Sequence, residues 1–286
     1  MRRPFSLVLF SFLFLMAVMA CSKNAAPQSN PSQLPQDTSV TGNDYSPSPA
    51  DPVFNNQLNT VLSRAALPGP MAKRILDAAR EDPAFIMDLL TVLQEDPYMY
   101  LLVDKTHPLP STYAPQDLVK LADLKNMSYL QNRNDLSLRK TAADALEVMA
   151  AAARADGVTL VASSTYRSYD YQVQLYARNV KQMGEAEANR VSAKPGESQH
   201  QLGLIVDFGS ITPEFAETKA GKWLAVNAGT YGWSLSFPKG YEDVTGYSWE
   251  CWHFRYVGKD LAYFIDAYFD GIQQYTLQFI HEWVNQ

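Results

Sequence analysis

The sequence is poor in cysteine, with only Cys21 and Cys251 among 286 residues. Cys21 ends an N-terminal apolar run that indicates an export signal, so Cys251 is left without a partner and no disulfide is expected. Basic residues are also in the minority, with 24 Lys and Arg against 30 Asp and Glu and a formal net charge of −6. This excess of acid argues against nucleic acid and anionic lipid surfaces as general partners.

What the chain does contain is enough apolar material for a sizeable core. Hydrophobic residues make up 47% of the sequence and aromatic residues 12%. A chain of this length and composition predicts one principal globular domain with a smaller appendage.

The N-terminus has the pattern of an export signal. Arg2 and Arg3 precede an apolar run over residues 5–20, which is short for a membrane span, and Cys21 follows. The pattern resembles a bacterial lipoprotein signal, in which the cysteine becomes the lipid-modified first residue. We therefore expect a signal peptide over residues 1–20, lipidation at Cys21 and attachment to a membrane through that lipid; an ordinary signal peptide is the alternative.

Residues 21–52 and 53–100 differ sharply in composition. The first range is rich in Pro, Ser, Asn and Gln and has almost no large apolar residue, which predicts a disordered tether. The second has apolar residues at helical spacing and predicts a helical appendage. This appendage is either a cap packed on the main domain or a module that docks onto the cell wall or a partner.

The main domain is expected over residues 101–286 and mixes helices with strands. Helices are predicted near residues 115–124, from a cap at Ser137 to Gly157, from Ser168 onward, over 212–228 and over 260–284. Strands are predicted over 158–162, 204–207, 232–237 and 247–256.

Two segments offer the side chains of a metal site. His200 lies in a loop, Asp207 follows the apolar run 204–206, and the second segment supplies Glu250 and His253. An acid in a buried strand is costly unless a cation or hydrogen-bond donors meet it. Residues 250 and 253 would face opposite sides of a regular strand, so Glu250 is expected in the turn before the strand or in a bulge. The other two histidines, His107 and His281, have no acid at ligand spacing and are expected to be structural.

Arg167 follows a predicted strand and precedes a predicted helix, where side chains often converge on a site. An arginine there can bind a carboxylate through two hydrogen bonds. The alternative is a surface arginine paired with a nearby acid.

Three motifs together carry a family resemblance. Tyr166-Arg167-Ser168 followed by Gln172, the Ser-x-His-x-x-Gly-x-x-x-Asp of residues 198–207, and Glu250-x-Trp252-His253 resemble the zinc D-alanyl-D-alanine carboxypeptidases of the VanY type. That family belongs to a wider group with lysostaphin-type peptidases and hedgehog domains. The resemblance covers about residues 101–275; Cys251 and Ile205 depart from it, standing where proline and a smaller residue are usual.

The resemblance implies a fold, a cofactor and a role for each site residue. The fold is α+β, with a small antiparallel sheet that carries zinc and is flanked by helices. The zinc ligands would be His200, Asp207 and His253, and Glu250 would be the catalytic base. Arg167 and Ser198 would grip the terminal carboxylate of the substrate, with Gln172 also on the substrate side.

The implied enzyme is a metallocarboxypeptidase that removes the C-terminal D-alanine from peptidoglycan stem peptides. Three protein ligands leave zinc a position for water, and a carboxylate that is not a ligand can take its proton. The same chemistry would serve an L,D-carboxypeptidase or a peptidoglycan endopeptidase, and a non-catalytic lipoprotein that binds wall peptides is a further alternative. The expected location is outside the cytoplasm, anchored to a membrane and facing the cell wall or periplasm.

Overall fold

The computed structural model describes residues 51–286, so the signal peptide, Cys21 and nearly all of the predicted tether lie outside the described residues. The α-helices are α1 Pro52–Arg64, α2 Gly69–Glu81, α3 Pro83–Leu93, α4 Lys140–Ala155, α5 Tyr169–Met183, α6 Glu185–Val191, α7 Lys219–Asn227, α8 Glu242–Thr245, α9 Lys259–Tyr268 and α10 Gln273–Val284. The strands are β1 Leu118–Lys120, β2 Leu130–Gln131, β3 Ser137–Arg139, β4 Val161–Ser164, β5 Ile205–Phe208, β6 Trp233–Leu235 and β7 His253–Tyr256.

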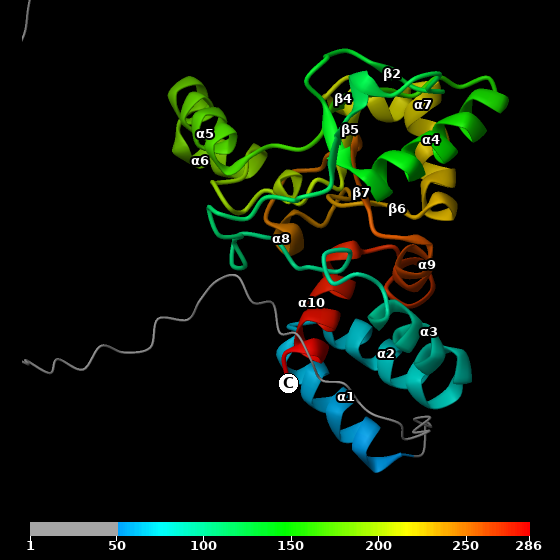
Figure 1. The fold of residues 1–286 in the computed structure, drawn as a ribbon. Helices are drawn as coiled ribbons and strands as arrows, with labels where there is room; N and C mark the ends of the chain where they lie inside the picture. The colour runs from blue at the N-terminus through cyan, green and yellow to red at the C-terminus, as the bar shows by residue number, and fades with distance from the viewer. Residues whose placement is uncertain (1–50) are drawn as a thin grey trace, which may run out of the picture. The chain divides into compact units, whose positions relative to one another are not determined.

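The main sheet is small, and its strand order is β2-β4-β5-β7-β6 (Figure 1). The pairs β4–β5, β5–β7 and β6–β7 are antiparallel, whereas the short edge strand β2 pairs with β4 in parallel. Strands β1 and β3 form a separate antiparallel pair. The α+β fold with a small sheet flanked by helices is confirmed, with one parallel edge that the sequence did not predict.

Helix α4 lies within the predicted range and contributes one apolar face to the main core, since Ala142, Leu146, Met149 and Ala153 are all buried. The start of α5 was also predicted correctly. Its N-cap is Ser168, whose hydroxyl accepts a hydrogen bond from the amide of Tyr171 at 3.2 Å. This cap places Arg167 in the turn between β4 and α5.

Two local predictions between residues 115 and 140 were wrong. The expected helix over 115–124 is instead β1 followed by a single 3₁₀ turn at Leu121–Asp123, and Ser137 lies in β3 rather than capping α4. Pairing between β1 and β3 holds both segments extended, with Lys120 opposite Ser137. Helix α4 therefore begins after Arg139, whose side chain makes no capping hydrogen bond.

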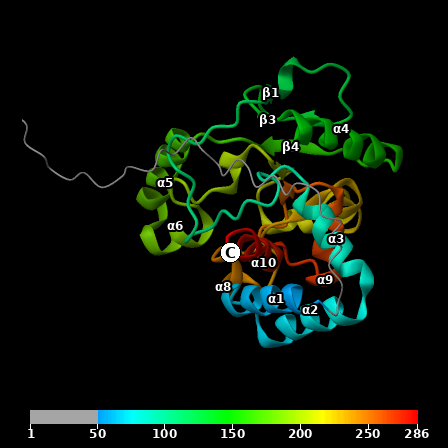
Figure 2. The same cartoon turned by 60° about the horizontal axis from the view of Figure 1, so that its bottom comes forward.

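The N-terminal helices share a core with the C-terminal ones. Helices α1, α2 and α3 lie against α9 and α10, as Figures 1 and 2 both show, and their buried apolar residues form one cluster. Arg255 of β7, fully buried, donates through Nη2 to the carbonyls of Met99 at 2.9 Å and Leu101 at 3.0 Å. The segment after α3 is thus tied to the strand that carries His253, and the described residues 51–286 belong to one compact unit.

Asp104 ties the loop after this segment to α10. Its carboxylate accepts hydrogen bonds from the amides of Thr106 at 2.8 Å and His107 at 2.9 Å, from the His107 ring, and from Gln274 Nε2 at 2.8 Å. The ring of His107 also contacts that of His281, with centroids 4.8 Å apart. Both histidines therefore have structural contacts, although the sequence did not indicate Asp104 as a partner for His107.

We expect Asp104→Ala to lower the free energy of unfolding by roughly 2 kcal/mol at pH 7, because buried donors lose their acceptor. Burial raises the pKa of Asp104, but the hydrogen bonds from Thr106 and His107 outweigh burial and hold that pKa below its ordinary value. The charged form is thus favoured by folding, and its contribution is lost as the pH falls below the pKa of an unfolded aspartate. Urea denaturation should show the deficit at pH 7 and a smaller one near pH 3, with Asp123→Ala, an exposed acid, as control. An equal deficit at both pH values would contradict a role for the charge.

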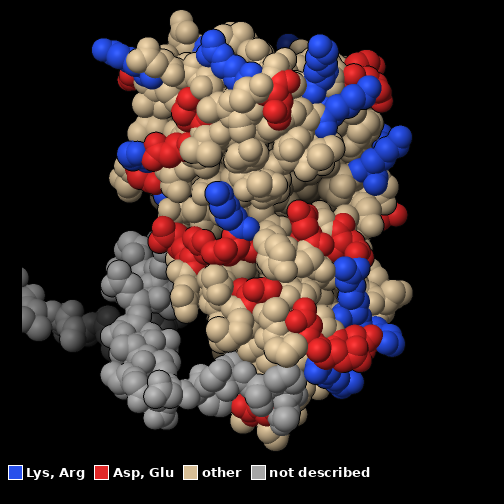
Figure 3. Space-filling model, turned by 90° about the vertical axis from the view of Figure 1, so that its right-hand side faces the viewer, with Lys and Arg blue, Asp and Glu red and all other residues tan. Residues whose placement is uncertain are grey.

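The surface mixes charges of both signs. On the face in Figure 3, Lys and Arg are intermixed with Asp and Glu, and acidic side chains gather across the middle. Within residues 51–286, no helix combines the length and apolar character that crossing a bilayer requires.

Candidate metal centre

Three elements of the sheet region bring the predicted ligands together. Asp207 lies on β5 directly opposite His253 of β7, and His200 lies on the 3₁₀ helix Gln199–Leu202 just before β5. Gly203 ends that 3₁₀ helix in the left-handed region, with φ +73°, where a Cβ atom would also lie 3.0 Å from the Leu118 side chain. The glycine of the motif thus allows the turn that aims His200 at Asp207.

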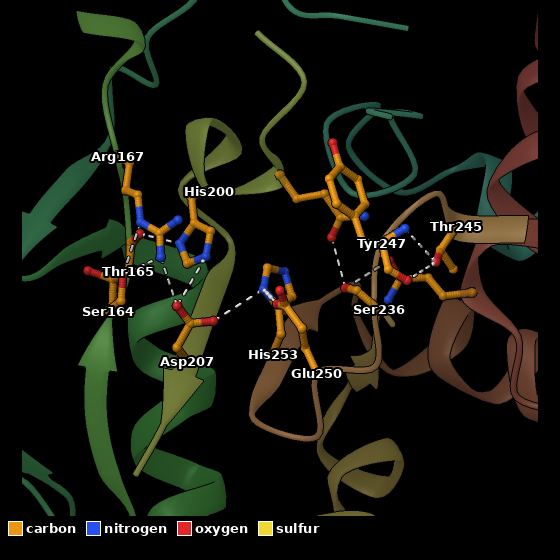
Figure 4. Close-up of polar contacts among 12 residues, drawn as sticks. Ser164, Thr165, Arg167, His200, Asp207, Ser236, Thr245, Tyr247, Glu250 and His253 are labelled. Atoms are coloured by element: carbon orange, nitrogen blue, oxygen red, sulfur yellow. Dashed lines mark hydrogen bonds and ion pairs between the residues drawn. The ribbon is translucent and has the colours of Figure 1, made fainter. Parts of the chain in front are cut away.

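The three side chains converge in a buried cluster. Asp207 Oδ2 lies 3.3 Å from His200 Nε2, and Asp207 Oδ1 lies 3.1 Å from His253 Nδ1. The two imidazole rings are perpendicular, with centroids 4.9 Å apart. Figure 4 shows Asp207 between His200 and His253, and all three side chains are at most 5% exposed.

The cluster fits a metal ion with nitrogen and oxygen ligands. One ligand atom from each residue lies within 4.8 Å of the others. His200 donates from Nδ1 to the carbonyl of Thr165 at 2.5 Å, which leaves its Nε2 lone pair facing Asp207. Asp207 Oδ1 is buried and lacks an aligned donor. Two imidazoles and one carboxylate are a donor set that zinc takes in catalytic sites.

The electrostatics of the protein groups alone also favour a cation. Burial lowers the pKa of His200 to about 4, helped by the charge of Arg167. Burial would lower the pKa of His253 too, but the carboxylates of Asp207 and Glu250 raise it to about 9. Burial disfavours the charged form of Asp207, yet the neighbouring histidines hold its pKa well below the ordinary value. A charged carboxylate in so buried a place is stabilised by positive charge beside it.

Glu250 lies beside the cluster but outside the three-residue group. It occupies the turn before β7, as predicted: its amide donates to the carbonyl of Phe237 at 3.0 Å, and its own carbonyl accepts from the His253 amide at 3.2 Å. Its Oε2 lies 3.2 Å from His253 Nδ1, and its side chain is 17% exposed. The turn therefore puts a partly solvated carboxylate next to the ligand atoms.

Arg167 is brought to the cluster from the opposite side. Its Nη2 donates to Asp207 Oδ2 at 2.9 Å and to Ser164 Oγ at 2.9 Å, and its amide donates to the carbonyl of His200 at 3.3 Å. Asp207 thus pairs with Arg167, as the alternative of a nearby acid allowed, although the arginine is only 20% exposed and does not lie on the surface. Within the described residues Nη1 makes no hydrogen bond and remains for a further partner.

One cavity of about 200 Å³ joins these groups. Its wall includes Arg167, Ser198, Glu250 and the three cluster residues. Gln172 is not on that wall: it is 2% exposed, and its Nε2 donates to the carbonyl of Ala193 at 2.7 Å. Gln172 thus supports the backbone at Ala193, which does line the cavity, and its predicted substrate contact stays a prediction.

Sequence reasoning missed three groups at the site. The Thr165 carbonyl and the Ser164 hydroxyl orient His200 and Arg167, and Tyr247 lines the cavity with a buried hydroxyl that lacks a hydrogen-bond partner among the described residues. Tyr247 stands three residues before Glu250, outside the three motifs, and nothing in those motifs indicated it. A backbone carbonyl leaves no trace in the sequence.

Comparisons with known proteins identify the family of this chain. A family model described as VanY, D-alanyl-D-alanine carboxypeptidase, matches residues 135–259, the range that holds every predicted catalytic, substrate-binding and metal-binding residue. The bifunctional D-Ala-D-Ala dipeptidase and carboxypeptidase VanXYC of Enterococcus gallinarum is 31% identical over 194 residues, which cover 65% of this chain and 94% of that protein. The chain belongs to the VanY family.

Other VanY-like proteins are similar over the same region. The putative carboxypeptidase YodJ of Bacillus subtilis (strain 168) is 41% identical over 182 residues, 62% of this chain and 66% of that protein, so the match spans about two thirds of its length. The structure of the LD-carboxypeptidase LdcB is similar with a TM-score of 0.54 and 37% identity, over 62% of this chain and 89% of that chain. A VanY D,D-pentapeptidase structure with Zn(II) is similar with a TM-score of 0.52 and 28% identity, over 66% of this chain and 99% of that chain.

Proposed function

We propose that this member of the VanY family is a zinc-dependent D-alanyl-D-alanine carboxypeptidase that removes the C-terminal D-alanine from peptidoglycan stem peptides. His200, Asp207 and His253 would hold the zinc. The observation that carries the proposal is the shared cavity: Glu250 lies against one side of the ligand cluster, with Oε2 3.2 Å from His253, and Arg167 lies against the other, 2.9 Å from Asp207. A base and a carboxylate-binding cation on either side of a metal suit hydrolysis of the last peptide bond.

When bound, zinc lowers the pKa of water and polarises the scissile carbonyl. Glu250 takes the proton of the attacking water at its carboxylate and passes it to the leaving amine. Arg167 uses Nη1 to bind the terminal carboxylate while Nη2 keeps Asp207 in place. Ser198, buried on the same wall, presents a hydroxyl to the peptide.

An L,D-carboxypeptidase is the second candidate, and one observation favours it. The LD-carboxypeptidase LdcB is 37% identical to this chain, against 28% for the VanY D,D-pentapeptidase. Both proteins cover nearly the same share of the chain, 62% and 66%, so the difference in identity does not come from a difference in coverage.

The proposal includes a location. The basic start, the apolar run over residues 5–20 and Cys21 support export and lipid attachment, and the polar composition of residues 21–52 suits a tether. A flexible coil of about 30 residues has a root-mean-square reach of roughly 30 Å. Such a tether would hold the catalytic unit near a membrane and within reach of wall peptides.

We expect the zinc-loaded protein to remove one alanine from a synthetic stem pentapeptide, and a chelator to abolish the reaction. Mass spectrometry of the products of pentapeptide and tetrapeptide, in separate reactions, distinguishes the candidates. Loss of alanine from the tetrapeptide alone would establish the L,D enzyme. No loss from either peptide by zinc-loaded protein would overturn both candidates and leave an endopeptidase or a wall-binding lipoprotein.

A further inference from the structure

The cavity wall carries one acid that the proposed reaction does not use. Glu197 lines the cavity directly before Ser198 and three residues before His200, and it is not one of the three residues grouped as metal ligands. Within residues 51–286 its carboxylate forms no ion pair, and its one hydrogen bond is a long one, accepted from the Lys194 amide at 3.4 Å. Partial burial of a carboxylate is costly, and one long hydrogen bond offsets little of that cost. Glu197 can therefore gain from a cation that binds in the cavity.

The loop fixes the backbone of Glu197 on the wall. The Glu197 amide donates to the carbonyl of Lys194 at 3.0 Å, and the Leu109 amide donates to the carbonyl of Gly196 at 2.9 Å. Gly196 has φ +90°, and a Cβ atom there would lie 2.7 Å from the Leu109 carbonyl oxygen. Only glycine fits at position 196. The close approach of the two backbones fixes the next two residues, Glu197 and Ser198, on the cavity wall.

Two cations near the cavity, Lys105 and Arg167, make contacts with other groups. Lys105 Nζ donates to the carbonyl of Asn189 at 2.7 Å and lies 4.6 Å above the ring of Tyr247. Burial lowers the pKa of Lys105 and the charge of Glu197 opposes that shift, yet the two groups do not come within 4 Å as an ion pair. Arg167 is bound to Asp207 and Ser164. Glu197 is left as an acceptor on the cavity wall.

We propose that Glu197 is a specificity residue that binds a cationic side chain of the peptide, upstream of the scissile bond. The substrate class is then a peptide with a free terminal carboxylate for Arg167 and a primary ammonium on one of the two residues before the bond. The inference rests on the proposed carboxypeptidase function, because it concerns the same cavity. It adds which peptides that cavity prefers.

The test uses paired peptides that end in the cleaved alanine and differ only in lysine or norleucine at the first or second residue before the bond. Norleucine keeps the aliphatic chain and removes the ammonium. We expect kcat/KM of the wild-type protein to be about fivefold higher for lysine at one of these positions, the size of one partly exposed ion pair. Glu197→Gln should bring the ratio close to one by reducing only the rate on lysine peptides, and Glu185→Gln, an exposed acid outside the cavity wall, should leave it unchanged.

Charge reversal gives a readout that a structural role would not produce. Glu197→Lys should favour a peptide with glutamate at that same position over its lysine counterpart, and the norleucine peptide reports whether the variant has kept its active site. Equal rates of the wild-type protein on lysine and norleucine peptides at both positions would overturn the inference while leaving the carboxypeptidase function intact. A zinc-loaded wild-type protein that cleaves none of the peptides would instead overturn the proposed function.

Discussion

The Glu250→Gln protein is expected to bind zinc as the wild type does and to lose about 10³-fold in kcat, within the range that general acid–base catalysis contributes. The substitution keeps the shape of the side chain and removes its ability to take a proton. The turn that holds it should survive, because the hydrogen bonds at residue 250 to Phe237 and His253 come from the backbone. The loss should therefore be chemical and not structural.

Zinc content separates this role from the alternative. Glu250 Oε2 lies 3.2 Å from His253 Nδ1, near enough for the carboxylate to act as a fourth ligand if the site rearranged. Metal analysis of the purified variant should give one zinc per chain, and turnover of pentapeptide or tetrapeptide should be measured on the same sample. Glu242→Gln, an exposed acid at the start of α8, is the matched control. Retained turnover in a zinc-loaded Glu250→Gln protein would contradict the role of base, and loss of zinc would make Glu250 a ligand.

The motif residues were the best-predicted part of the site. His200, Asp207 and His253 converge as predicted. Glu250 lies in the turn before β7, which was predicted because residues 250 and 253 would face opposite sides of a regular strand. That argument needed only local geometry. The pairing of Asp207 with His253 across β5 and β7 is a long-range contact, and the family resemblance supplied it rather than the spacing.

The failures share a cause, since each depends on contacts between distant segments. Serine is a residue type favoured at the N-cap of a helix, but pairing with Lys120 of β1 keeps Ser137 in an extended strand. Gln172 is one helical turn from Ser168, and its Nε2 binds the carbonyl of Ala193, twenty-one residues on, so that the side chain is buried behind the cavity wall. For Arg167, the sequence could indicate a carboxylate partner but not that Asp207 already serves as one.

The pairing of Arg167 with Asp207 changes what its removal should do. We expect Arg167→Ala to lower kcat/KM on peptides with a free terminal carboxylate on the order of 10²-fold, the cost of leaving a charged partner unpaired in a desolvated site. Peptides with an amidated C-terminus should lose far less, because they have no carboxylate for Nη1 to bind. The remaining loss on amidated peptides would measure the support that Nη2 gives to Asp207 at 2.9 Å.

Arg167→Lys distinguishes the two contributions, since lysine keeps the charge and lacks the planar group that bridges Ser164, Asp207 and a third partner. If the carboxylate clamp dominates, this variant should stay selective for free over amidated peptides while zinc content remains at one per chain. If support of Asp207 dominates, both substitutions should weaken zinc binding in a chelator competition and should reduce the rates on free and amidated peptides equally. That second outcome would remove Arg167 from substrate recognition and make it a positioning residue for the metal ligand. The preference for a free C-terminus would then have to come from Ser198 and the rest of the cavity wall.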